Sequence, residues 1–224
     1  MTNSRVPKVG VLLSGCGFLD GAEIHEAVFT LLVLDQHQAE IVCCAPNTPQ
    51  ATTVDHVAGQ PVAETRNVLT EAARIARGRI RDVATVSAGE LDALILPGGF
   101  GAAKTLCNFA ERGGACDVHP AVEKLVGDML AQRKPVGAIC IAPALLGRVA
   151  AKRGLKPRLT IGNDAGTAAA LRQMGCIHDE RGVTEIAVDE ENKLVTTPAY
   201  MLGPGPAAVF EGIRKLVEQV LRMI

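Results

Sequence analysis

Aromatic residues are scarce in this chain, which has no Trp, one Tyr and five Phe among 224 residues. Few rings are therefore available to stack on nucleotide bases. Neither sign of charge is in excess, because 23 Lys and Arg residues are matched by 24 Asp and Glu residues. Proteins that bind nucleic acid or anionic membranes through their charge carry a basic surplus. We therefore expect neither nucleic acid nor a membrane surface as a partner.

Signals for export, disulfides and zinc are also missing. The start of the chain, residues 1–10, is polar and leads into an apolar run too short for a signal peptide or a membrane span. The seven Cys residues are odd in number and form no C-x-x-C pair, a usage typical of reduced thiols in a cytosol. Cys and His residues do not have the spacing of zinc ligands. We expect a cytoplasmic protein that holds no metal.

The composition that is present is that of an ordinary globular protein, with 48% hydrophobic and 21% charged residues. It excludes disorder and collagen-like repeats. A chain of this length buries roughly 70% of the surface that its unfolded form exposes, which is enough for a substantial core. No shift in composition marks a linker, so residues 1–224 are expected to form a single domain.

Apolar strands and helical patterns alternate along the chain. Strands are expected at residues 8–13, 39–45, 91–96, 135–140 and 159–162, with a hairpin over 185–197. Helices are expected at residues 22–37, 65–75, 120–132, 141–146, 164–174 and 207–224. Residues 46–61 indicate a small excursion from the sheet, and the pattern of residues 100–120 assigns no element. The alternation predicts an α/β fold with a doubly wound, mainly parallel sheet.

In an open parallel sheet, ligands bind beyond the carboxyl ends of the strands. The residues that follow the expected strands are therefore candidates for a site: Ser14 to Cys16, Pro97 to Gly99, Cys140, Asn163 with Asp164, and Thr196 to Pro198.

Cys140 is the strongest of these candidates because it joins a strand to a helix with no loop between them. Such a junction forces a sharp turn that presents the side chain above the sheet, as in a nucleophile elbow. The helix that begins at Ile141 is expected to lower the thiol pKa through its N-terminal dipole. The Ile141 amide and an amide of the Gly98–Gly99 turn could then hold an oxyanion. The alternative is an inert cysteine buried in the core.

Several segments carry a family resemblance. Gly98–Gly99 after an apolar strand, the run AICIAP at 138–143 and the run GAEIHE at 21–26 resemble the PfpI-like branch of the class I glutamine amidotransferase-like superfamily. Within that branch the chain resembles the ElbB glyoxalase group, also described as isoprenoid biosynthesis proteins with an amidotransferase-like domain. Four further segments fit that group, at residues 14–17, 65–69, 100–104 and 196–200.

The resemblance implies a flavodoxin-like three-layer sandwich, usually a homodimer, with a glutamate of the first helix beside the elbow cysteine. Alignment of residues 21–28 on the family pattern gives that role to Glu26 rather than Glu23. A carboxyl that shuttles protons beside a thiol needs a pKa raised by partial burial. The alternative for Glu26 is a solvated glutamate on an exposed helix face.

The chain also departs from related patterns. Many PfpI-like enzymes have His directly after the nucleophile, where this chain has Ile141, and others have His near the position of Asn163. An amidase needs an acid to expel the amine, so these departures count against amidase activity. The segment His178-Asp179-Glu180 could supply a His-x-Glu pair, although a polar turn is the ordinary explanation. His25 is expected to be a neighbour of Glu26 and not its partner, because successive helical residues diverge by about 100°.

The resulting hypothesis is a cofactor-independent glyoxalase III-type lyase, which converts glyoxal or methylglyoxal to glycolate or lactate through a Cys hemithioacetal. The expected site comprises catalytic Cys140 and Glu26, oxyanion-binding Gly99 and Ile141, and substrate-binding Gly98, Cys16, Asn163 and Thr197. One alternative is a glutaminase- or amidase-like subunit or accessory protein linked to isoprenoid biosynthesis. Another is a non-enzymatic redox sensor that uses Cys140.

Overall fold

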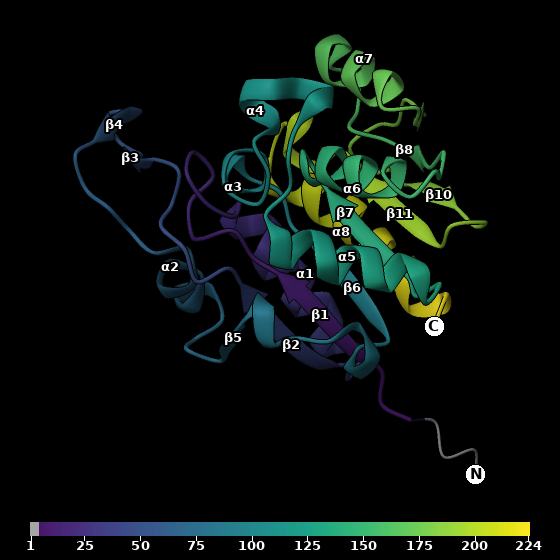
Figure 1. The fold of residues 1–224 in the computed structure, drawn as a ribbon. Helices are drawn as coiled ribbons and strands as arrows, with labels where there is room; N and C mark the ends of the chain where they lie inside the picture. The colour runs from purple at the N-terminus through teal and green to yellow at the C-terminus, as the bar shows by residue number, and fades with distance from the viewer. Residues whose placement is uncertain (1–4) are drawn as a thin grey trace.

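A seven-stranded sheet forms the centre of the molecule in the computed structural model, which describes residues 5–224 (Figure 1). The strand order is β10-β11-β7-β6-β1-β2-β5, and every neighbouring pair is parallel except β10 with β11. The strands are β1 (Lys8–Leu12), β2 (Glu40–Ala45), β5 (Ile80–Asp82), β6 (Ala93–Leu96), β7 (Val136–Ile139), β10 (Ala187–Asp189) and β11 (Leu194–Thr197).

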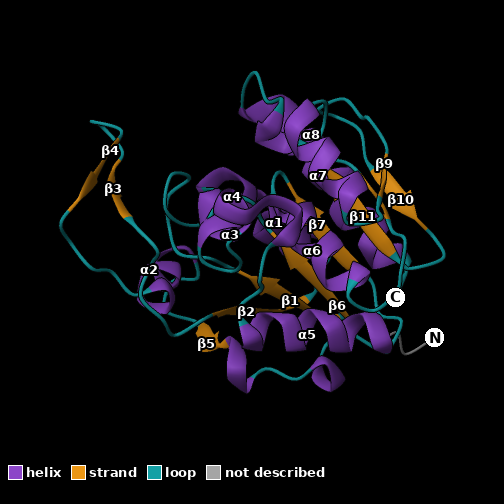
Figure 2. Cartoon of the chain, turned by 45° about the horizontal axis from the view of Figure 1, so that its top comes forward, coloured by secondary structure: helices purple, strands orange, loops and turns teal. Residues whose placement is uncertain are grey.

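Helices cover both faces of this sheet, so the molecule has three layers (Figure 2). One face packs against α1 (Ile24–Gln36), α2 (Val68–Ile75) and α8 (Pro206–Arg222). The other face packs against α3 (Phe100–Lys104), α4 (Phe109–Arg112), α5 (Pro120–Ala131), α6 (Ala142–Ala151) and α7 (Ala165–Gln173). This arrangement confirms the expected α/β fold with a mainly parallel sheet.

The alternation of side chains along each strand builds two separate cores. Val11 belongs to the hydrophobic cluster on the α1 and α8 side, whereas its neighbour Leu12 belongs to the cluster on the α5 and α6 side. In β6, Ile95 faces the first cluster and Leu96 the second. Successive residues of a strand point to opposite faces, so strands that are apolar throughout are buried on both sides.

Smaller elements complete the chain. The strands β3 (Thr53–Asp55) and β4 (Gln60–Val62) form a hairpin, and β8 (Arg158–Leu159) pairs with β9 (Ile177–His178). Short 3-10 turns lie at Val83–Thr85, Ala88–Glu90, Gly113–Ala115 and Ala199–Met201. The strand expected at 159–162 thus lies outside the main sheet. The apolar pattern did not predict β5, which forms one edge of the main sheet.

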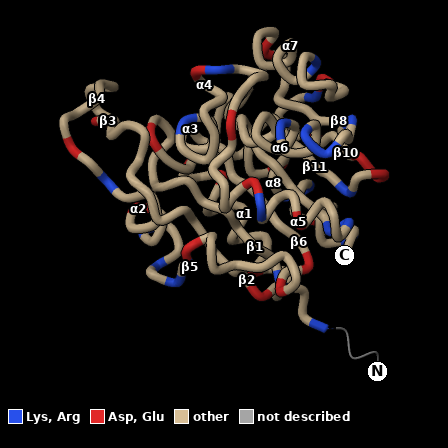
Figure 3. The backbone as a smooth tube through the Cα atoms, in the orientation of Figure 1, with Lys and Arg blue, Asp and Glu red and all other residues tan. Residues whose placement is uncertain are grey.

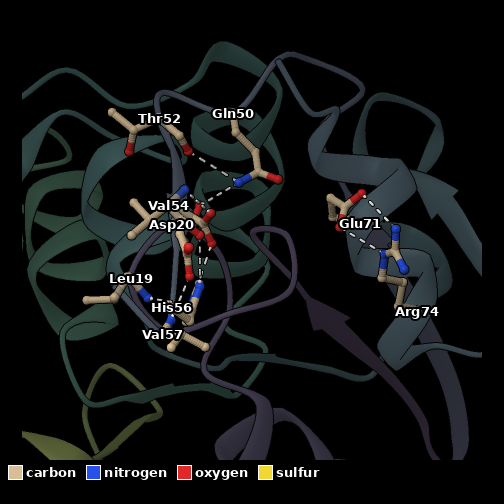
Figure 4. A network of polar contacts seen from close by, with 10 residues as sticks. Leu19, Asp20, Gln50, Thr52, Val54, His56, Val57, Glu71 and Arg74 are labelled. Carbon is tan, nitrogen blue, oxygen red and sulfur yellow. Dashed lines mark hydrogen bonds and ion pairs between the residues drawn. The ribbon is translucent and has the colours of Figure 1, made fainter. Parts of the chain in front are cut away.

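The β3–β4 hairpin is the excursion expected within 46–61, and it stands away from the sheet at the left of Figure 1. Its base is fixed to the loop after β1 through the buried Asp20, whose carboxylate accepts a hydrogen bond from the Val54 amide at 2.8 Å. The Gln50 side chain donates to the Asp20 carbonyl at 3.2 Å, and His56 Nε2 accepts from the Leu19 amide at 3.3 Å (Figure 4). These contacts hold the loop that carries residues 14–23.

Acidic and basic residues are interspersed along the chain trace (Figure 3). Among residues 5–224, no helix combines the length and the apolar character needed to cross a membrane. Within the same range, no cluster of three or more His, Cys, Asp or Glu side chains is arranged to hold a metal ion.

Candidate active site

Cys140 occupies a kink between β7 and α6. Its φ angle is 62°, a left-handed conformation that non-glycine residues rarely adopt and that is concentrated at functional sites. The Cys140 amide donates to the Thr197 carbonyl at 3.0 Å, so the pairing of β7 with β11 extends into the kink. The sharp turn expected at the strand–helix junction is present.

Glu26 lies in the first turn of α1, and its residue is fully buried. Its two carboxyl oxygens accept hydrogen bonds from the Gly98 amide at 2.8 Å and the Tyr200 amide at 3.3 Å. The Cys140 side chain lies close to the same carboxyl, across the backbone of Gly98. Burial, with a contribution from the nearby Glu23 charge, raises the pKa of Glu26 to about 8. Glu26 is therefore protonated near neutral pH, and the solvated helix-face alternative is wrong.

Gly98 separates these two groups and makes their contact possible. A Cβ atom on residue 98 would lie 2.4 Å from the Cys140 Cβ and 2.7 Å from Glu26 Oε2. Both distances are far below van der Waals contact, so no residue with a side chain fits without displacing the pair. The neighbouring Gly99 has a φ angle of 93°, which glycine alone adopts without strain.

The expected lowering of the Cys140 thiol pKa is wrong. The residue is only 8% exposed, and burial, together with the Glu26 charge, raises the pKa of the thiol well above its ordinary value. Amides of Gly99 and Ile141 donate hydrogen bonds toward the sulfur and act in the opposite direction, but burial prevails. The two amides assigned to an oxyanion hole thus face the sulfur.

A cavity of about 520 Å³ lies over Cys140. It is lined by Phe18, Glu23, Gly99, Phe100, Ala103, Phe109, Ala110, Cys140, Ile141, Asp164, Thr167, Tyr200 and Met201. Most of these residues follow the ends of β1, β6, β7 and β11, and Asp164 and Thr167 come from the start of α7. The cavity therefore occupies the carboxyl edge of the sheet, where the sequence placed a site.

Tyr200 and His25 are site components that the sequence analysis did not identify. The Tyr200 hydroxyl forms a 2.7 Å hydrogen bond with His25 Nδ1, while its backbone amide binds Glu26. Burial and the charges of Glu23 and Glu26 raise the pKa of the Tyr200 hydroxyl, which therefore keeps its proton. The available signal was the position of the only tyrosine, two residues after Pro198 at the same sheet edge.

None of the four expected substrate-binding residues lines the cavity. Thr197 is buried, and its hydroxyl donates to the Glu185 carbonyl at 2.8 Å. Cys16 is half-buried beside the carboxylate of Glu71, away from the cavity lining. Asn163 is exposed and lies next to the residue that does line the cavity, Asp164. Gly98 lies beneath the cavity, where its amide binds Glu26.

Histidines are absent from the lining of this cavity within residues 5–224. His178 lies on β9, where burial lowers the pKa of its ring. The alternative that pairs His178 and Glu180 with Cys140 therefore has no structural support. His25 does not line the cavity itself, but it contacts two residues that do, Tyr200 and Glu23.

Known proteins resemble this chain in sequence and in structure. The model of the DJ-1/PfpI family matches residues 16–200. The human protein named "Glutamine amidotransferase-like class 1 domain-containing protein 3, mitochondrial" is 44% identical over 226 residues, which cover 96% of this chain and 83% of the human protein. The zebrafish "ES1 protein, mitochondrial" is 33% identical over 96% of this chain and 85% of its own length.

Among solved structures, an isoprenoid biosynthesis protein with an amidotransferase-like domain from Ehrlichia chaffeensis superposes with a TM-score of 0.92 at 34% identity. The match covers 97% of this chain and 99% of that one. Glyoxalase III from Candida albicans superposes with a TM-score of 0.65 at 14% identity, over 97% of each chain. That second likeness concerns the fold alone.

Proposed function

Because this chain belongs to the DJ-1/PfpI family of the class I glutamine amidotransferase-like superfamily, we propose that it is a cofactor-independent glyoxalase. Its substrates would be glyoxal and methylglyoxal, and its products glycolate and lactate. The observation that carries the proposal is the close approach of Glu26 to the kinked Cys140 across Gly98, with two amides directed at the sulfur. Nucleophile and anion donors thus line the cavity, and the proton carrier lies buried directly behind the nucleophile.

In the first step, the Cys140 sulfur bonds to the aldehyde carbon and the carbonyl π electrons move to oxygen. The Gly99 and Ile141 amides, which already lie at the sulfur, stabilise the negative charge on that oxygen. The thiol proton passes to the same oxygen with Glu26 as its carrier. The product is a hemithioacetal, and no atom enters or leaves beyond the two reactants.

In the second step, the hemithioacetal carbon gives its proton to the ionised form of Glu26, which returns a proton to the neighbouring carbonyl carbon, while the hydroxyl proton passes from the first substrate oxygen to the second. One carbon is oxidised and the other reduced, so the step needs no external oxidant or reductant. Glu26 is suited to carry this proton because its pKa of about 8 lies close to neutral pH. The Tyr200 hydroxyl, held by His25, would bind the second substrate oxygen.

In the last step, water attacks the resulting thioester and releases the 2-hydroxy acid and the free thiol. The whole sequence adds one water to the substrate. The test is glycolate formation from glyoxal by the purified protein, with Cys140→Ala and Glu26→Gln as controls. The proposal is wrong if the wild type forms no more glycolate than Cys140→Ala.

A glutaminase or an accessory protein of isoprenoid biosynthesis is the second candidate. It is favoured by the names of the human and Ehrlichia chaffeensis proteins. It is disfavoured by the cavity lining, which offers no His within residues 5–224 to protonate a departing amine. Ammonia release from glutamine would support this candidate in place of the first.

Three further expectations stay predictions. A redox sensor would need a thiol that ionises readily, whereas burial raises the pKa of Cys140. A cytoplasmic location is tested by fractionating the source cells, since the human and zebrafish relatives carry mitochondrial names. A homodimer is tested by the molar mass of the purified protein in light scattering.

A further inference from the structure

The cavity collects most of the aromatic residues in a chain that has few of them. Phe18, Phe100, Phe109 and Tyr200 line it, and they are four of the six aromatic residues in the sequence, which has five Phe, one Tyr and no Trp. The remaining two, Phe29 and Phe210, pack against each other with ring centroids 5.3 Å apart. The aromatic residues are thus concentrated at the proposed site.

Two of these rings are left largely uncovered. Phe18 is 48% exposed and Phe100 is 45% exposed, and exposed apolar surface at the mouth of a cavity is typical of a ligand contact. Each ring is held by one polar neighbour. Lys104 Nζ lies 4.8 Å from the centroid of the Phe100 ring, and His56 meets Phe18 edge-on at 5.5 Å. The rings are therefore positioned in advance of any ligand.

The size of the cavity also indicates a ligand larger than a two-carbon dialdehyde. A volume of about 520 Å³ falls within the range of pockets that bind drug-sized molecules. A two-carbon dialdehyde bound to Cys140 would fill a small part of this space and would leave the aromatic wall in water. Such a small polar molecule would gain little from contact with Phe18, Phe100 and Phe109, which offer only apolar surface.

We propose that the preferred substrate is a 2-oxoaldehyde whose keto carbon carries an aromatic or branched apolar group, which packs against Phe18, Phe100 and Phe109. This inference rests on the proposed function and assigns its substrate class. The reaction remains balanced, because R–CO–CHO and one water give R–CH(OH)–COOH. Only the two carbonyl carbons change, and the group R stays intact against the wall.

The test compares phenylglyoxal with glyoxal in initial-rate measurements that follow mandelate and glycolate. For the wild type we expect kcat/KM to be at least about tenfold higher for phenylglyoxal. Because the two aldehydes differ in intrinsic reactivity, the decisive quantity is the change in this ratio on substitution. Phe100→Ala should lower kcat/KM for phenylglyoxal about tenfold more than it lowers kcat/KM for glyoxal.

Two further variants and one control check that the effect comes from the apolar surface. Phe18→Ala should act in the same way as Phe100→Ala, and it provides a second test if one variant folds poorly. Phe100→Leu should restore most of the lost activity because it returns apolar volume. Val57→Ala, at a fully exposed position of the β3–β4 hairpin, is the matched control and should leave both substrates unaffected.

The outcomes separate this inference from the proposed function. If both aldehydes are consumed but the wall variants change their kinetics equally or not at all, the assigned substrate class is wrong and the glyoxalase function stands. If the wild type consumes neither aldehyde faster than Cys140→Ala, the proposed function fails and this inference fails with it.

Discussion

The carboxyl group of Glu26 and the side chain of Cys140 lie close together at Gly98 inside the protein, and burial raises the pKa of both groups. Each disfavours the negative charge of the other, so the pair resists full ionisation. The resting site thus holds protons, one of which a substrate oxygen can accept as the sulfur bonds to the aldehyde carbon. This relationship leads to the first two predictions.

Replacement of Glu26 by Gln should lower the pKa of the Cys140 thiol, because the variant removes the carboxylate charge that raises it. We expect iodoacetamide to label Cys140 several times faster in Glu26→Gln at pH 8, although glycolate formation falls. Since the chain has seven cysteines, the labelling is measured on the peptide that contains Cys140. Equal labelling rates at every pH would contradict the coupling.

The stability of the wild type should fall as the pH rises from about 5 to 8. The pKa of Glu26 is raised from 4.5 to about 8 in the folded state, so folding favours the protonated form. The associated stability is complete below the unfolded pKa and is lost as the pH rises through the folded pKa. Across this window the wild type should lose on the order of 3 kcal/mol more than Glu26→Gln. Urea unfolding at a series of pH values measures both slopes, and parallel slopes would overturn the prediction.

Gly98→Ala should damage both stability and turnover, because its Cβ would lie 2.4 Å from the Cys140 Cβ. We expect a loss of about 2 kcal/mol in the free energy of unfolding, typical of overpacking. Gly205→Ala is the matched control, because a Cβ there meets nothing within 4 Å and its φ of 174° suits any residue. That variant should stay within about 0.5 kcal/mol of the wild type. Similar losses in the two variants would show that close approach at Gly98 is not the cause.

Tyr200→Phe should keep the fold and the amide contact to Glu26, since only the hydroxyl is removed. We expect kcat to fall about tenfold for both aldehydes because the second substrate oxygen loses a donor. His25→Ala should lower kcat in the wild type but have little further effect in Tyr200→Phe, because His25 acts through the Tyr200 hydroxyl. Thr167→Val, which removes another hydroxyl of the cavity lining, serves as the control. Independent effects of the two substitutions would exclude this linkage.

The central strands were predictable from sequence because they are buried on both faces. β1, β6 and β7 appear as uninterrupted apolar runs, and their ends therefore marked the sheet edge that holds the site. The edge strand β5 was missed because Ile80–Asp82 contains one apolar residue among two charged ones. The short helices α3 and α4 in the unassigned segment depend on tertiary contacts that local periodicity does not contain.

Only the site residues that carry a local sequence signal were predictable. Cys140 was marked by its strand–helix junction, and Glu26 by a family pattern. The His25–Tyr200 contact joins residues 175 positions apart, so no local sequence pattern predicts it. The direction of the Cys140 pKa shift was also beyond reach, because it depends on how far burial outweighs the helix dipole, and the sequence does not give the extent of burial.

All the hydrogen-bond donors described at the Glu26–Cys140 pair belong to the main chain: the amides of Gly98, Gly99, Ile141 and Tyr200. Side-chain replacement leaves an amide in place unless proline is introduced. Most substitutions therefore retain the main-chain donors at the proposed reactive centre, whereas they can replace the side chains of the aromatic wall. Proteins with this fold can therefore differ in the substrates that they bind and still keep the same main-chain donors.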